Sequence, residues 1–275
     1  MIEALINGSR PGDLEHAFAA ADRGVHYGDG LFETMLLKQG RVPLLEAHLQ
    51  RLMLGCVRLS LSCPDLGVLR AEIQEVCGAT SDGVVKLLLT RGAAGRGYAP
   101  APAAASTRMI SLYPPATPQP FEIQVAWCNT RLGRNAQLAG IKHLNRLEQV
   151  LAQMNVVAAG VDEGLMLDSA DELVSAVSSN VFWCAIVRCS RQTCVIAVSG
   201  GVMRGQVLRI AAEAGIAVHE GALRTEDVRG ATEVFLTNAV HGLRAVVALD
   251  EQRWKVGPMA LQLHAELQRL LEAGC

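Results

Sequence analysis

Lysine is scarce in this sequence, which has only four, at positions 38, 86, 142 and 255. Lys38 and Lys255 lie in polar segments that contain glycine, where an exposed ammonium group is ordinary. Lys86 lies in a strand-like apolar run. Lys142 follows a glycine-isoleucine pair and precedes a long amphipathic segment, so the elements around it could hold its side chain in a cleft. A lysine with a chemical role is therefore expected at Lys142.

The sequence also lacks a large net charge and any long apolar run. The formal net charge is −2 and half of the residues are hydrophobic, which excludes a disordered chain or a basic nucleic-acid-binding protein. No basic segment precedes an apolar one at the start, and no run approaches the roughly 20 apolar residues that span a bilayer. We expect a cytoplasmic protein that binds a small molecule, and neither nucleic acid nor membrane.

Paired cysteines are absent as well. The eight cysteines include no Cys-x-x-Cys pair and no Cys/His cluster with the spacing of a zinc site. The sequence therefore predicts no disulfide and no bound metal.

The 275 residues are enough for one large domain or two ordinary ones. Four prolines fall between Tyr113 and Pro120, and such a segment cannot continue a helix or a central strand. We predict a linker at residues 114–121. It would join a smaller N-terminal α+β domain, residues 1–113, to a larger C-terminal domain, residues 122–275.

Hydrophobic periodicity predicts an α/β or α+β fold with mixed sheets. In the first domain we predict strands at 4–8, 31–37, 84–90 and 109–112, and helices near 45–52 and 69–76. In the second domain we predict strands at 122–127, 164–167, 173–177, 181–186, 216–219, 233–237 and 243–249. Its helices are expected at 144–160, with an apolar stripe at 144, 147, 151, 154 and 158, at 198–215, and at the C-terminus.

Three separate features suggest a phosphate group. The glycine-rich segment Ser199–Arg204 begins a predicted helix, where free N–H groups and the helix dipole favour an anion. Thr237 and Asn238 end a predicted strand, and Arg51 could bind a phosphate through two parallel hydrogen bonds. Each feature alone has an ordinary interpretation, namely a flexible turn, a strand end and a solvated arginine.

A phosphate site and one isolated lysine together suggest pyridoxal 5′-phosphate, which a protein binds through its phosphate and through a Schiff base with lysine. Lys142 is the candidate for that lysine. The alternative, a lysine at a helix start with its ammonium group in solvent, stays open from the residues alone.

The segment Arg131–Val150, which contains Lys142, closely resembles the same segment of the bacterial 4-amino-4-deoxychorismate lyases. These are fold-type IV pyridoxal-phosphate enzymes, related to D-amino-acid and branched-chain aminotransferases. Further similar segments extend the resemblance over nearly the whole chain: Asp22–Gly30, His48–Leu52, Arg91–Tyr98, Ser178–Trp183 and Gly201–Arg204. The resemblance implies the fold-type IV architecture, pyridoxal 5′-phosphate as cofactor and a homodimer.

The resemblance also implies roles for individual residues. Lys142 matches the Schiff-base lysine and Arg51 the phosphate-binding arginine, while Val202 and Met203 match the pair whose backbone amides hold the phosphate. The other implied cofactor contacts are Ser178, Ser179, Thr237 and Asn238. The implied substrate-carboxylate residues are Arg96 and Tyr98, on a loop that can reach into the partner subunit's site.

One position departs from the resemblance. Fold-type IV enzymes usually have a glutamate five residues before the position of Asn180, where it keeps the pyridine nitrogen protonated, and here that residue is Ser175. Glu172 would face the opposite side of a strand unless a bulge intervened. A serine hydroxyl can hydrogen-bond the nitrogen but cannot stabilise its positive charge, so we expect a weaker electron sink.

The implied reaction converts 4-amino-4-deoxychorismate to 4-aminobenzoate and pyruvate, a step of folate biosynthesis. It is a β-elimination in which Lys142 removes the proton from C4 of the substrate. Two alternatives stay open: a D-amino-acid or branched-chain aminotransferase of the same fold, and a non-catalytic relative that binds a phosphate ligand without turnover.

Overall fold

The computed structural model describes residues 3–12, 18–100, 105–187, 191–196, 200–221 and 223–273. The chain forms two compact units. The first contains Met1–Thr117, Ile141–Asn145 and Leu271–Cys275, and the second contains Pro118–Gly140 and Arg146–Leu270. The change from Thr117 to Pro118 falls inside the predicted linker, and two later segments belong to the first unit. That the units act as a smaller domain and a cofactor-binding domain stays a prediction.

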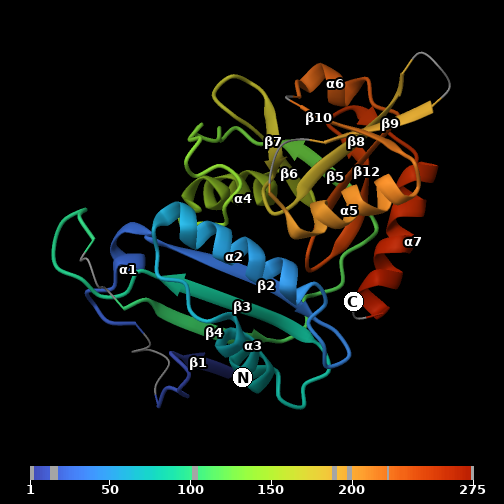
Figure 1. The fold of residues 1–275 in the computed structure, drawn as a ribbon. Helices are drawn as coiled ribbons and strands as arrows, with labels where there is room; N and C mark the ends of the chain where they lie inside the picture. The colour runs from blue at the N-terminus through green and yellow to red at the C-terminus, as the bar shows by residue number, and fades with distance from the viewer. Residues whose placement is uncertain are drawn as a thin grey trace. The chain divides into compact units, whose positions relative to one another are not determined.

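The first unit is built on a four-stranded sheet with the strand order β1-β4-β3-β2 (Figure 1). All three neighbouring pairs are antiparallel, so the prediction of mixed sheets was wrong for this unit. The connections β2–β3 and β3–β4 each return the chain beside the preceding strand in the opposite direction, and β1 pairs antiparallel with β4 at the other edge. Its elements are β1 (Glu3–Ile6), α1 (Arg23–Tyr27), β2 (Gly30–Leu37), α2 (Leu45–Leu59), α3 (Leu66–Cys77), β3 (Gly83–Thr90) and β4 (Thr107–Tyr113).

The two faces of this sheet differ in burial. Along β2, Leu31 and Met35 are fully buried, whereas Phe32 and Thr34 between them are half-buried. Helix α2 covers the buried face, and a Cβ atom added at Gly55 would lie 2.7 Å from the Leu31 side chain. A glycine is needed there because helix and strand approach so closely.

The second unit is built on a mixed sheet with the order β10-β9-β8-β11-β12-β5-β6-β7, to which β13 adds by pairing with β12. The pairs β9–β10, β5–β12 and β5–β6 are parallel and the others antiparallel, which confirms the mixed sheet predicted here. The elements from β5 onward are β5 (Glu122–Trp127), α4 (Leu147–Ala159), β6 (Glu163–Leu167), β7 (Leu173–Ala176), β8 (Asn180–Val187), β9 (Arg191–Ile196), α5 (Val202–Glu213), β10 (Ala217–Glu220), α6 (Thr225–Arg229), β11 (Glu233–Asn238), β12 (Gly242–Leu249), β13 (Gln252–Arg253) and α7 (Pro258–Ala273), whose last residues belong to the first unit.

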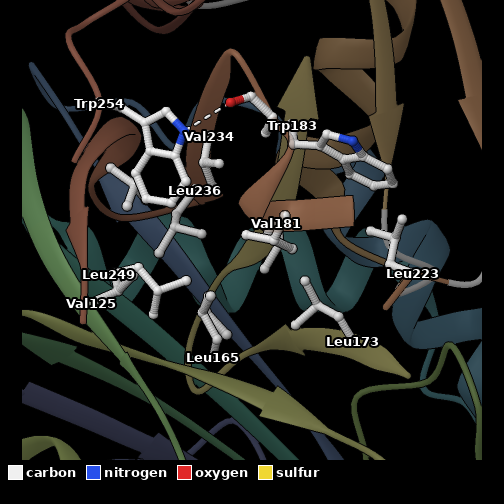
Figure 2. Close-up of a cluster of buried hydrophobic side chains, with 14 of the residues drawn as sticks. Val125, Leu165, Leu173, Val181, Trp183, Leu223, Val234, Leu236, Leu249 and Trp254 are labelled. Carbon is white, nitrogen blue, oxygen red and sulfur yellow. Dashed lines mark hydrogen bonds between the residues drawn. The ribbon is translucent and has the colours of Figure 1, made fainter. Parts of the chain in front are cut away.

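A continuous apolar core supports the middle of this sheet. Figure 2 shows buried side chains of this core, among them Leu165, Val181 and Leu236, and its members come from β5, β6, β7, β8, β11 and β12. The indole N–H of Trp254 donates to the carbonyl oxygen of Ala231 at 2.9 Å, which satisfies its one polar group inside the core. The core therefore fixes β8 and β11, and their ends carry several of the predicted site residues.

Helix α4 differs from the prediction in two ways. It begins at Leu147 instead of residue 144, because residues 142–144 pair with β2: the Phe32 N–H donates to the Lys142 oxygen at 2.9 Å, and the Leu144 N–H donates to the Gly30 oxygen at 3.0 Å. The helix also exposes its apolar stripe and buries the smaller Ala152 and Val156. In the described part of the chain, no helix is long and apolar enough to cross a membrane.

Candidate functional site

Lys142 lies on the half-buried face of the first unit's sheet. Leu31 and His143 form a β-bridge, so Lys142 is opposite Phe32 and its side chain lies on the same face as the Phe32 ring. The ammonium nitrogen is 4.3 Å from the centre of that ring. The backbone on both sides of Lys142 is thus held by strand pairing, and an extended segment presents this side chain.

The glycine-rich segment before β2 helps to hold the lysine segment. The Asn145 side-chain amide donates to the carbonyl oxygen of Gly28 at 3.1 Å. Gly28 has a φ of +63°, and a Cβ atom there would lie 2.6 Å from the Asn145 Oδ1 atom. Both the positive φ and the close approach favour glycine at this position.

Arg51 is oriented by a buried carboxylate. Its Nε and Nη2 atoms donate to the two oxygens of Glu33 at 2.7 and 2.5 Å, and His48 Nδ1 lies 2.7 Å from Glu33 Oε2. Burial by itself raises the pKa of the Glu33 carboxyl, but the hydrogen bonds from Arg51 and His48 outweigh it and hold the pKa below its ordinary value. The Glu33 carboxylate therefore fixes the plane of the Arg51 guanidinium.

Arg23 holds the backbone of the predicted substrate loop. The Arg23 guanidinium donates to the carbonyl oxygens of Gly97 and Tyr98 at 2.9 and 2.8 Å, and lies 4.8 Å from the centre of the Tyr27 ring. The Arg96 side chain is exposed and Tyr98 is 86% exposed. The loop is thus anchored through its backbone and presents both predicted substrate residues to the outside.

In the second unit, the start of α5 offers free backbone N–H groups. Gly201 is the N-cap without a side-chain cap, and the first turn contains no acidic residue. The Gly205 N–H is bonded to the Gly201 oxygen at 3.1 Å, so the N–H groups of Val202 and Met203 precede the first helical bond. Ser199, part of the same predicted motif, lies outside the described residues.

A buried hydroxyl lies next to this helix start. Thr237 is directly opposite Asn180 in the sheet, and a Cβ atom added at Gly201 would lie 1.8 Å from Asn180 Oδ1. The Thr237 Oγ1 atom is buried and has no hydrogen-bond partner among the described residues. A buried hydroxyl without a partner costs about 1–3 kcal/mol, and an anion at the helix start would satisfy it. These residues fit the phosphate of pyridoxal 5′-phosphate.

The other predicted cofactor contacts are connected by two residues that the sequence reasoning missed, Glu163 and Arg244. Glu163 accepts hydrogen bonds from the Ser178 N–H at 3.1 Å, the Ser178 hydroxyl at 2.8 Å, the Ser179 hydroxyl at 3.1 Å and Arg244 Nη2 at 2.8 Å. The Asn238 amide in turn donates to Ser179 Oγ at 3.1 Å. The sequence did contain a signal for them, because Glu163 and Arg244 are each a charged residue in an otherwise apolar strand.

Ser175 lies opposite Met166 next to an irregularity in the β6–β7 pairing. Such an irregularity is what could turn Glu172 toward the face of Ser175. The Glu172 carboxylate, however, is bonded to Arg134, which also donates to Asp168 at 2.6 Å. Glu172 therefore already has a cationic partner and does not stand as a free replacement for the missing glutamate.

The predicted residues are thus divided between the two units, and a buried glutamate holds part of each set: Glu33 holds Arg51, and Glu163 holds Ser178 and Ser179. The first set is Arg51, Arg96, Tyr98 and Lys142, and the second is Ser175, Ser178, Ser179, Val202, Met203, Thr237 and Asn238. Within the described residues, no group of three His, Cys, Asp or Glu side chains is arranged to hold a metal ion.

The sequence pattern of a known family covers most of the chain. Residues 30–249 match the family described as Amino-transferase class IV. The chain belongs to the amino-transferase class IV family. The fold-type IV architecture predicted from the resemblance is therefore confirmed.

Within the amino-transferase class IV family, the chain is similar to proteins of two activities. The crystal structure of 4-amino-4-deoxychorismate lyase from Pseudomonas aeruginosa superposes with a TM-score of 0.88, at 38% identity, over 97% of this chain and 98% of that one. Aminodeoxychorismate lyase of Vibrio harveyi is 28% identical over 86% of this chain and 88% of its own length. A putative branched-chain-amino-acid aminotransferase of Methanocaldococcus jannaschii is 27% identical over 89% and 87%.

Proposed function

We propose that this chain is a pyridoxal-phosphate-dependent lyase that converts 4-amino-4-deoxychorismate to 4-aminobenzoate and pyruvate. The buried, unpartnered hydroxyl of Thr237 beside the free amides of α5 carries the cofactor part of this proposal. The 38% identity over nearly the whole of the Pseudomonas lyase favours the lyase reaction over the aminotransferase reactions of the same family.

Pyridoxal phosphate, when bound, supplies an aldehyde that links to amines and a ring that accepts electron density. Its phosphate would be held by the N–H groups of Val202 and Met203, by the Thr237 hydroxyl and by Arg51. Further contacts to the cofactor would come from Ser178, Ser179 and Asn238. Lys142 would attach to the cofactor and, once released by the substrate amine, would take the proton from C4 of the substrate.

Ser175 suits an elimination better than a transamination. A serine near the pyridine nitrogen can donate a hydrogen bond but supplies no negative charge, and loss of the leaving group together with aromatisation asks less of the ring than amino-group transfer does. Ser175→Glu should therefore leave the pyruvate-release rate within about threefold, roughly 0.7 kcal/mol. A gain of a hundredfold would contradict this account.

We also propose a homodimer. The apolar side chains of α4 that face outward form a stripe along one side of the helix, and a stripe of this kind marks an interaction surface. Its members are Leu147, Val150, Leu151, Met154 and Val157, each between 45% and 73% exposed. Light scattering should give twice the chain mass of 29.3 kDa, and Met154→Glu should shift the mass toward the monomer.

The decisive experiment is an absorption spectrum of the purified protein with pyridoxal phosphate, before and after borohydride reduction, followed by peptide mapping and a pyruvate-release assay. We expect the reduced adduct on Lys142 and release of pyruvate from 4-amino-4-deoxychorismate. Lys255→Ala, which changes an exposed lysine, should leave both results unchanged, whereas Lys142→Ala should abolish them.

Other outcomes would identify the alternatives. Conversion of the cofactor to its pyridoxamine form by D-amino acids or branched-chain amino acids, without pyruvate release, would favour an aminotransferase. No spectral band and no adduct would favour a non-catalytic phosphate-binding relative.

A further inference from the structure

Two of the four lysines lie on the same face of the first unit's sheet. The register places Lys142, Phe32 and Leu88 in one row across the sheet. Lys86 lies opposite Thr34 in the next row, two residues along. Residues two apart on a strand share a face, so the two lysines and the Phe32 ring belong to one surface.

The two ammonium groups approach the same aromatic ring. Lys142 Nζ is 4.3 Å and Lys86 Nζ is 5.8 Å from the centre of the Phe32 ring. The two nitrogens are therefore no more than about 10 Å apart, with a ring face within cation–π range of both. This is the length scale of one small ring-shaped molecule with a group at each end.

Lys86 differs from three buried or half-buried arginines of this unit. Arg23, Arg51 and Arg108 are each bonded to a carboxylate. Among the described residues, no carboxylate lies within 4.0 Å of the Lys86 ammonium, which lies near the Phe32 ring. A half-buried cation without a counter-ion is unfavourable, and a bound anion would offset that cost.

We propose that Lys86 binds the ring carboxylate of the substrate and of the aromatic product. This inference rests on the proposed lyase function, because that substrate carries an amine and a carboxylate on opposite carbons of a six-membered ring. With the amine end at Lys142, the carboxylate end points toward Lys86, the Phe32 ring lies against the substrate ring, and the Thr34 hydroxyl neighbours the carboxylate. The ammonium group of Lys86 is needed for this role, because the apolar part of its side chain could not distinguish the acid from its neutral amide.

The test compares two ligands on two proteins. Binding of 4-aminobenzoate and of its neutral analogue 4-aminobenzamide is measured by calorimetry on the cofactor-loaded parent protein and on Lys86→Met, which keeps the apolar stem. We expect Lys86→Met to weaken the binding of 4-aminobenzoate about 10- to 100-fold, as for a lost hydrogen bond between charged groups. The affinity for 4-aminobenzamide should change by less than about twofold. Lys86→Arg should restore part of the preference.

The same variants are assayed for pyruvate release. KM should rise in Lys86→Met by a similar factor while kcat changes less than about threefold, since the contact is made in the ground state and the transition state alike. Lys255→Met is the matched control and should change neither constant. Thermal unfolding of each variant checks that the fold is retained.

The outcomes separate the two proposals. Pyruvate release with an unchanged KM in Lys86→Met, or an equal loss of acid and amide binding, would overturn the carboxylate subsite and leave the lyase standing. A parent protein that prefers the acid through Lys86 but releases no pyruvate would overturn the lyase and support the subsite. A parent protein that binds neither ligand would overturn the subsite.

Discussion

In each unit of the molecule an almost fully buried glutamate is paired with an arginine, but Glu33 in the first unit and Glu163 in the second organise different things. Glu33, with a side chain 1% exposed, bonds Arg51 through two parallel hydrogen bonds and contacts His48, both on α2. Glu163, 4% exposed, bonds Arg244 on β12 and three groups of Ser178 and Ser179 between β7 and β8.

The difference shows two uses of the same chemical pair. In the first unit the carboxylate fixes one guanidinium, which is 15% exposed and therefore still reaches solvent or ligand. In the second unit the arginine is 5% exposed, and the carboxylate fixes a turn of the backbone. The first glutamate orients a partly exposed side chain, and the second connects a backbone turn to an arginine on another strand.

The largest effect should come from Arg244→Met. It leaves the Glu163 carboxylate buried without its cation, so we expect the free energy of unfolding to fall by about 3–5 kcal/mol. Urea unfolding measures this. Arg131→Met, which breaks the exposed pair with Asp171, should cost less than about 1 kcal/mol. An equal small loss in both variants would mean that the buried pair contributes little.

Arg51→Lys should have a smaller effect on stability. Lysine keeps the charge beside Glu33 but cannot form the two parallel bonds, and a loss of about 1–2 kcal/mol is expected. Arg70→Lys, at the exposed pair with Glu46, is the control. On the proposed function, Arg51→Lys also weakens pyridoxal-phosphate binding in a fluorescence titration. Unchanged affinity would remove Arg51 from the phosphate site.

Ser179→Ala and Ser178→Ala sharpen the comparison inside the second unit. The Ser179 hydroxyl lies between Glu163 and Asn238, so its removal breaks two hydrogen bonds at about 1 kcal/mol each. Ser178→Ala keeps the backbone hydrogen bond from residue 178 to Glu163 and should therefore lower the free energy of unfolding by less. Unfolding midpoints in urea give the order, and the reverse order would show that the turn is held by other contacts.

The smallest effect concerns pH. Burial, and then the charge of Arg244, lowers the pKa of His241 below 6.5, with Glu163 opposing. Below pH 6.5 the unfolded chain therefore binds more protons than the folded one, so stability falls as the pH falls through this range. His241→Gln should show a shallower decrease between pH 7 and pH 5.5 in urea unfolding, and an unchanged slope would contradict it.

Glu33 should act at lower pH. Its pKa is held below the ordinary 4.5, so its contribution to stability is present above pH 4.5 and is lost as the pH falls through the lower folded pKa. The two units should therefore lose stability in different pH ranges.

Long periodic runs were predictable from the sequence, and short or paired segments were not. The strand at 122–127 has the predicted bounds, and α2, α3 and α5 overlap the predicted helices. The short elements α1, α6 and β13 carry too few residues for a periodic signal, and the strand β9 was also not predicted. The start of α4 was misjudged because pairing with β2, which is distant in sequence, takes up the backbone of residues 142–144.

The candidate site divides in the same way. Lys142, Arg51, Thr237 and Asn238 belong to recognisable local motifs, so the sequence could nominate them. Glu163 and Arg244 are 81 residues apart, and no local pattern links a carboxylate to an arginine on another strand. The neighbouring positions of Lys86 and Lys142 likewise depend on strand register.

By itself, the sequence determined the family, the order of the main helices and strands, and the residues that motifs bring forward, because these depend on composition and local periodicity. Tertiary structure decided which side of α4 is buried, which carboxylate orients Arg51, and which lysines share the Phe32 ring. Those outcomes depend on the register and packing of segments far apart in the chain, where burial makes an unpaired charge too costly to leave without a partner.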